Sequence, residues 1–216
     1  SWLDCLIEPY MVVELASPVV GVIDSITVDR GSVIKTGQVV AILQSEIELA
    51  NVKVARARLE FNQRKYLRSE ELFKKELLSS HEKDLAETEK KIAETELHRS
   101  KELLNMRTIK SPISGVVVER FVSPGELTRQ EKILKIAQIN PLNVEVIAPV
   151  EMFGTISPGM GAKVKTEDVV GSTYRARVKV IDRVVDAASG TFGVRLELPN
   201  PRRQIPAGIK CKVRFE

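Results

Sequence analysis

The sequence predicts a mainly β protein that carries one α-helical hairpin. Three observations support this fold class. One β-like pattern occurs twice, 94 residues apart. The segment between the two copies, residues 44–107, contains no glycine or proline and is rich in helix formers. The last third of the chain is a series of short β-like runs separated by turn residues. The domains are therefore nested, with the helices inserted into one β domain and a second β domain following it.

The repeated β pattern spans residues 16–43 and 108–139. Gly21 and Gly31 in the first copy correspond to Gly115 and Gly125 in the second, with ten residues between the glycines of each pair. Each copy is typical of three short strands separated by two glycine turns, so we assign the four glycines structural roles. Because a half-unit of this size cannot bury an apolar face alone, we expect the two copies to pack together as one domain.

Residues 44–107 are typical of two antiparallel helices, each of about 30 residues and ~45 Å long. Ser79 and Glu82 form a capping-box pattern, which predicts that the second helix begins there. Apolar residues follow the seven-residue spacing of a coiled coil in three series, namely Ile47, Val54 and Phe61; Leu59, Tyr66 and Phe73; and Leu78, Leu85 and Ile92. The first two series lie on different faces of the first helix. One face can pack on the second helix, and the other needs a further partner or is only partly covered.

Residues 140–216 contain about six short β-like runs, among them 143–148, 162–166, 175–180, 192–198 and 210–215. Turn residues separate these runs, which predicts a small antiparallel β-barrel. The opening run at 7–15 belongs to neither copy of the repeat. We therefore assign residues 1–15 to the barrel, which they complete from the other end of the chain.

The composition and the motifs exclude several classes of protein. The formal charge of +4 is too small and too evenly interleaved to indicate nucleic-acid binding. No run of ~20 apolar residues is present that would span a membrane as a helix. The sequence lacks a phosphate-binding glycine loop, a nucleophile elbow and a zinc-helix motif, so we expect no enzyme activity and no cofactor. His81 and His98 have no converging ligands, so we expect no metal site.

The arrangement resembles the periplasmic adaptor, or membrane fusion protein, family of tripartite efflux pumps, and in particular the resistance-nodulation-division type. That family has two lipoyl-like halves split by a coiled-coil hairpin, followed by a β-barrel. Residues 108–117 are similar to its second lipoyl half, which usually has alanine where Ser111 stands. Residues 185–195 resemble its barrel signature, and 205–208 resemble its closing turn, although the usual order there is proline-glycine.

The expected hairpin tip carries a further resemblance. Adaptors of resistance-nodulation-division pumps have an arginine, a leucine four residues later, a serine seven further and an aspartate five beyond, and Arg68, Leu72, Ser79 and Asp84 match those spacings. The resemblance implies that these residues contact a TolC-type outer-membrane channel. Each residue also has a plainer interpretation. Arg68 would be a solvated charge and Leu72 a contact within the hairpin. Ser79 would be an N-cap, and Asp84 a favourable negative charge at a helix start. The helices are short for the family, and its membrane-proximal domain is missing or reduced.

The resemblance implies a non-enzymatic adaptor that links an inner-membrane transporter to the outer-membrane channel for export of drugs or other toxic compounds. It also implies a periplasmic ring, usually hexameric. No signal peptide is visible and the sequence opens abruptly at Ser1, so we expect it to be part of a longer protein. The resemblance implies attachment to the inner membrane through residues outside this sequence. Two alternatives stay open. One is an adaptor of an ATP-driven exporter. The other is a biotin or lipoyl carrier, which is disfavoured because the hairpin replaces the turn that presents the carrier's lysine.

The two cysteines, Cys5 and Cys211, lie at opposite ends of the chain. The first and last strands are both assigned to the barrel, and the implied compartment is oxidising, so we expect the two residues to be near each other. A disulfide between them stays open, because Cys5 lies near an unanchored end. A Cα separation beyond ~7 Å would exclude the bond.

Overall fold

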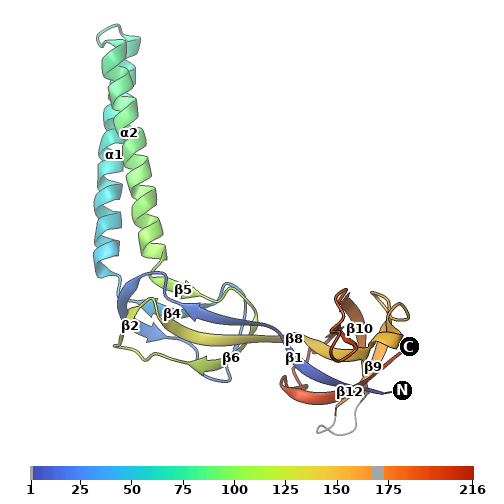
Figure 1. The fold of residues 1–216 in the computed structure, drawn as a ribbon. Helices are drawn as coiled ribbons and strands as arrows, with labels where there is room; N and C mark the ends of the chain where they lie inside the picture. Colours follow the sequence, from blue (N-terminus) through green and yellow to red (C-terminus); the bar gives the residue numbers. More distant parts are fainter. Residues whose placement is uncertain (1, 167–172) are drawn as a thin grey trace.

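A computed structural model describes residues 2–166 and 173–216 of the chain. Three parts follow one another in space, as Figure 1 shows: a β-barrel that holds both chain ends, a lipoyl-like β-sandwich, and an α-helical hairpin that projects from the sandwich. The predicted fold class, mainly β with a hairpin inserted into the sandwich, is confirmed.

The barrel closes from six antiparallel strands in the order β1-β12-β9-β10-β11-β8, with β8 pairing back onto β1. Alternating apolar residues on each strand face inward, so the described part of the barrel has one continuous apolar core. A single 3-10 turn, η1 (Val150–Met152), follows β8. The strands are β1 (Leu3–Ala16), β8 (Lys132–Pro149), β9 (Gly161–Thr166), β10 (Thr173–Ile181), β11 (Thr191–Leu198) and β12 (Ile209–Phe215).

The lipoyl-like domain is built from both copies of the sequence repeat. Strands of the two halves pair with each other, β2 with β7 and β3 with β6, and one apolar core contains residues of both halves. The short strands are β2 (Val20–Ile26), β3 (Val33–Ile34), β4 (Val39–Leu43), β5 (Thr108–Lys110), β6 (Gly115–Arg120) and β7 (Leu127–Arg129). The expectation that the two copies pack together as one domain is met by this interlocked pairing.

The hydrogen bonds of the two halves follow an internal pseudo-symmetry. The Gly31 amide donates to the Val117 carbonyl, and the Gly125 amide donates to the Ile23 carbonyl, both at 2.8 Å. The two bonds are equivalent, because Gly31 corresponds to Gly125 and Val117 corresponds to Ile23, each 94 residues away. Ser111 repeats the role of Ser17, since each buried hydroxyl donates to the backbone carbonyl two residues later. This bond accounts for a serine at the position where the family usually has alanine.

The four repeat glycines have two different structural requirements. Gly31 and Gly125 both have a φ of +87°, which side chains rarely allow. Gly21 and Gly115 have ordinary φ values, but in each case a neighbouring group fills the space that a Cβ would take. A Cβ at Gly115 would lie well within 3.0 Å of the Ala137 carbonyl oxygen. The space at Gly21 is taken by a different neighbour, the guanidinium of Arg107.

Two long strands, β1 and β8, run through both β domains (Figure 1). The assignment of residues 1–15 to the barrel alone therefore needs correction. Residues 5–9 of β1 pair with the barrel half of β8, whereas residues 11–16 pair with 132–138, next to the lipoyl core. The alternation of apolar residues continues along the whole of β1, so the sequence does not show where the strand leaves the barrel core and joins the lipoyl core.

The hairpin consists of α1 (Glu46–Lys74) and α2 (Ser80–Asn105). The face of α1 with Leu59 and Tyr66 points toward α2, where both are half-buried. The other series, Ile47, Val54 and Phe61, is 72%, 67% and 61% exposed. The third series is not the packing face, because Leu85 and Ile92 remain half exposed and α2 contacts α1 through Ala86, Ala93 and Leu97. Small alanine side chains allow the helices to approach more closely than leucine would.

Cys5 and Cys211 form a disulfide between directly opposed residues of β1 and β12. Their Cα atoms are 4.8 Å apart, inside the range that disulfides require. The expected loose end at Cys5 is wrong, because β1 begins at Leu3 and Cys5 already pairs in the barrel.

Candidate docking site at the hairpin tip

The tip of the hairpin is shaped by how α1 ends. The Leu77 amide donates to the Leu72 carbonyl at 2.9 Å, and the Glu76 amide donates to the Phe73 carbonyl at 2.9 Å. This pair of bonds is a Schellman motif, which requires a left-handed residue after the helix. Glu76 takes that position with a φ of +58°, where glycine is usual. The chain therefore reverses without the glycine or proline that normally marks such a turn.

Ser79 begins α2 through a complete capping box. Its hydroxyl accepts the Glu82 amide at 3.2 Å, and the Glu82 carboxylate accepts the Ser79 amide at 3.0 Å. The Ser79 hydroxyl also donates to that carboxylate, at 2.7 Å. These bonds hold the pKa of Glu82 below the ordinary value of 4.5, with the Ser79 hydroxyl as the larger cause and the Ser79 amide as the second. The capping interpretation of Ser79 is thus confirmed, while its channel contact stays a prediction.

The other three predicted tip residues lie on the two helices near this turn. Arg68 lies two residues from Tyr66, which faces α2, so Arg68 lies about 200° around α1 and points outward. Asp84 has the same relation to the buried Ala86 on α2. Leu72 is half-buried. Within the described chain, no hydrogen bond or ion pair joins any two of Arg68, Leu72, Ser79 and Asp84. They form a dispersed surface of charge and apolar contact, which suits docking of a macromolecule rather than chemistry on a bound molecule.

The most prominent apolar residue of the tip is one that the spacing argument missed. Leu77 is 70% exposed in the turn, whereas Leu72 is half-buried. The signal was present in the sequence, because two leucines directly precede the capping box. Its exposure follows from the left-handed Glu76, which turns Leu77 away from the helix pair.

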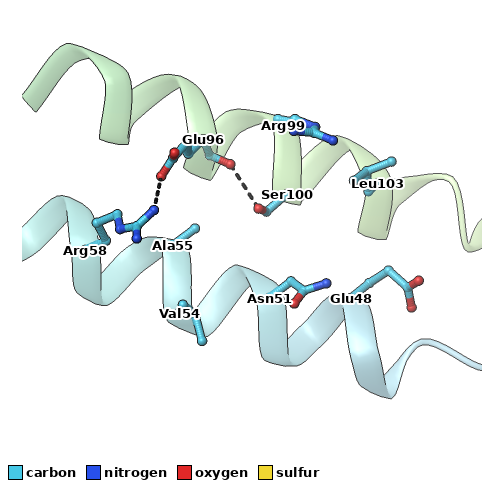
Figure 2. A pocket seen from close by; sticks show the side chains of 9 residues that line it. All are labelled: Glu48, Asn51, Val54, Ala55, Arg58, Glu96, Arg99, Ser100 and Leu103. Atoms are coloured by element: carbon cyan, nitrogen blue, oxygen red, sulfur yellow. Dashed lines mark hydrogen bonds and ion pairs between the residues drawn. The ribbon is translucent and has the colours of Figure 1, made fainter. Parts of the chain in front are cut away.

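Below the tip, a shallow groove runs between the helices near the base of the hairpin. Figure 2 shows the Arg58 guanidinium bridging to Glu96 of α2, at 3.0 Å, with Val54 and Leu103 among the residues that line the groove. No three metal-binding side chains of the His, Cys, Asp and Glu types come together anywhere in the residues described. The groove is lined by charged, polar and apolar side chains of both helices.

Two family models divide the chain as its structure does. The CzcB-like barrel-sandwich hybrid domain matches residues 11–138, and the CusB-like β-barrel domain matches residues 142–216. The chain belongs to the periplasmic adaptor, or membrane fusion protein, family. Members of this family are adaptors of efflux pumps and not enzymes.

Relatives of the adaptor include two proteins of Pseudomonas putida. It is 24% identical over 216 residues to the solvent efflux pump periplasmic linker SrpA, covering 93% of this chain and 56% of the relative. It is likewise 24% identical to the toluene efflux pump periplasmic linker protein TtgG of the same species, covering 93% of this chain and 55% of that protein. The adaptor sequence thus spans about half the length of these relatives.

Solved structures share the fold at low sequence identity. A MacA-MexA chimeric protein that contains the Pseudomonas aeruginosa MexA α-hairpin domain has a TM-score of 0.84 at 18% identity, covering 100% of this chain and 80% of that one. A membrane fusion protein of Streptococcus pneumoniae R6 has a TM-score of 0.76 at 14% identity, covering 100% and 98%. Among the described residues of the adaptor, neither helix has the length and apolar character needed to cross a membrane.

Proposed function

We propose that the adaptor is the periplasmic subunit of a resistance-nodulation-division efflux pump, in which it links an inner-membrane transporter to a TolC-type outer-membrane channel. The observation that carries the proposal is the projecting hairpin, whose tip presents Arg68, Leu72, Ser79 and Asp84 at the family's spacing. The two Pseudomonas putida relatives are named as linkers of a solvent efflux pump and a toluene efflux pump, which supports export of toxic organic compounds. The proposal extends this export to drugs.

The proposal includes self-association in a ring, usually hexameric in the family, with attachment to the inner membrane. The exposed series Ile47, Val54 and Phe61 supports self-association, because it gives the hairpin an apolar face for a neighbouring copy to cover. An ATP-driven transporter in place of the resistance-nodulation-division partner is the second candidate. Identifying the inner-membrane protein that co-purifies with the full-length adaptor distinguishes the two.

Reversing the charge at Arg68 tests the docking role of the tip. Arg68 is an exposed residue of α1, so Arg68→Asp should change the free energy of unfolding by no more than about 0.5 kcal/mol. Efflux should nevertheless collapse, because the substitution places an unfavourable charge at the docking surface. The measurements are drug and solvent susceptibility of cells, adaptor abundance, and thermal melts of the purified protein.

Arg56→Asp is the matched control, since Arg56 is an exposed arginine on the same helix but far from the tip. It should leave efflux unchanged. Leu72→Asp is a less clean test, because Leu72 is half-buried and its substitution also affects the end of α1. Full resistance in cells that carry Arg68→Asp and Leu72→Asp together would contradict docking through the tip.

A further inference from the structure

The junction between the hairpin and the lipoyl-like domain is narrow. Residues 44–45 lead from β4 into α1, and residues 106–107 lead from α2 into β5. In the described chain neither helix packs along a strand of the domain, and the apolar core of the hairpin is separate from the lipoyl core. The direction of the hairpin therefore depends on what bonds cross this junction.

One side chain, that of Arg107, bridges the junction. Its Nη2 donates to Glu48 Oε1 in the first turn of α1 at 2.6 Å, and its Nη1 donates to the Val20 carbonyl in β2 at 3.0 Å. Its backbone carbonyl accepts the Leu43 amide at the end of β4, at 2.8 Å. One residue thus ties the start of α1 and the end of α2 to two strands of the domain. Figure 2 shows Glu48 at the end of α1 that adjoins this junction.

The Arg107–Glu48 ion pair is the most protected one in the described structure. Its side chains are 21% and 16% exposed, whereas both partners in every other described pair are at least 30% exposed. Shielding from water strengthens the attraction between charges and makes the loss of one partner more costly. An ion pair at this position can resist bending in a way that the exposed pairs along the hairpin cannot.

The Arg107 side chain occupies the space beside Gly21, so a Cβ at this position would have to displace it. A Cβ at Gly21 would lie well within 3.0 Å of Arg107 Nη1, and 2.8 Å from Leu43 Cδ2. The matching Gly115 makes room for a backbone carbonyl instead. Gly21 thus lies against a side chain that crosses the junction, whereas Gly115 lies against backbone.

We propose that Arg107 is a positioning residue that fixes the direction of the hairpin on the lipoyl-like domain. It acts by bridging Glu48 and the Val20 carbonyl with one planar guanidinium. A lysine ammonium at the end of a flexible chain does not reproduce that planar fork. The inference rests on the proposed function in one respect, because direction is useful to the adaptor only if the tip must reach a partner.

Pulsed electron-paramagnetic-resonance distances test the proposal on the purified protein with its disulfide intact. Spin labels at Glu87→Cys in α2 and Glu119→Cys in β6, both exposed positions, report the direction of the hairpin. Labels at Glu87→Cys and Arg56→Cys report the hairpin itself. In Arg107→Ala the first distance distribution should broaden about two-fold, as a freed hinge allows, while the second stays as narrow as in the wild type.

Three further variants make the result specific. Arg107→Lys and Glu48→Gln should broaden the first distribution less than Arg107→Ala, because each keeps part of the bridge. Arg99→Ala, which removes an exposed arginine from α2 without touching the junction, should leave both distributions unchanged. Glu48→Gln also keeps the proposal testable if Arg107→Ala fails to fold.

Each outcome bears on a different claim. An unchanged first distribution in folded Arg107→Ala and Glu48→Gln would overturn the positioning role. Broadening of both distributions would also overturn it, since the residue would then only stabilise the hairpin. The distances are measured without any channel or transporter. If the first distribution broadens while cells with Arg68→Asp and Leu72→Asp together keep full resistance, the positioning role stands and the tip-docking function fails.

Discussion

At the scale of single residues, comparing the two halves of the lipoyl-like domain identifies a polar side chain at a position that is apolar in the other half. Thr128 in β7 is completely buried, and its hydroxyl has no hydrogen-bond partner among the described residues. The corresponding position in the first half is Ile34, which is also completely buried. A buried hydroxyl without a partner is unfavourable because it has lost its bonds to water.

Thr128→Val should therefore stabilise the adaptor by about 1 kcal/mol, since valine keeps the shape and removes the unpaired hydroxyl. Chemical denaturation followed by circular dichroism measures the change. Thr27→Val is the control for a hydroxyl that has a partner: Thr27 is exposed and its hydroxyl donates to the Val39 carbonyl at 2.7 Å, so its loss should give no gain. Equal stability of Thr128→Val and wild type would mean that water or local movement satisfies the hydroxyl.

At the scale of elements, the hairpin depends on its ends as much as on its apolar contacts. Its core consists largely of Val52, Ala55, Ala86, Ala93 and Leu97, which is a small amount of buried apolar surface for two long helices. Ion pairs between the helices, such as Arg58–Glu96, are exposed and contribute little. The capping box at Ser79 therefore matters for the start of α2, and an N-cap serine contributes about 1 kcal/mol.

The capping box makes the tip sensitive to acid. The pKa of Glu82 in the folded protein lies below 4.5, so its contribution is complete above that pH and is lost as the pH falls through the folded value. In Ser79→Ala the pKa of Glu82 should rise toward 4.5, because the Ser79 hydroxyl is the main cause of the shift. Titration of the Glu82 carboxyl by nuclear magnetic resonance measures both values. Ser80→Ala is the control, and a pKa equal to that of the wild type in Ser79→Ala would refute the assignment.

At the scale of the whole molecule, β1 and β8 form an antiparallel pair that extends through both β domains. The barrel closes only because β1, from the start of the chain, pairs with β12 from its end. The Cys5–Cys211 disulfide joins these two strands across a sequence separation of 206 residues. It therefore restricts the unfolded chain over nearly its full length.

Removing the disulfide should destabilise the barrel by about 2–4 kcal/mol, the usual range for such a bond. The test compares thermal melts of the wild type with those of the double variant Cys5→Ser and Cys211→Ser, with and without reductant. Reductant should lower the melting temperature of the wild type and leave that of the variant unchanged. Identical melts for all four samples, or free thiols in the oxidised wild type, would contradict the bond.

The sequence by itself determined the features that repeat or that act locally: the two β-halves, the inserted hairpin, the capping box at Ser79 and the run of barrel strands. Periodicity and turn chemistry need only neighbouring residues, so they can be read without a fold. Four features were decided only by the tertiary structure, because each depends on contacts between residues far apart in the chain. They are the sharing of β1 between two cores, the burial of Ala86 and Ala93 in place of Leu85 and Ile92, the formation of the Cys5–Cys211 bond between two residues that were expected only to be near each other, and the Arg107 bridge to Glu48 and Val20. The last of these has no local signature, since the arginine, the glutamate and the space left by Gly21 become related only when the hairpin meets the domain.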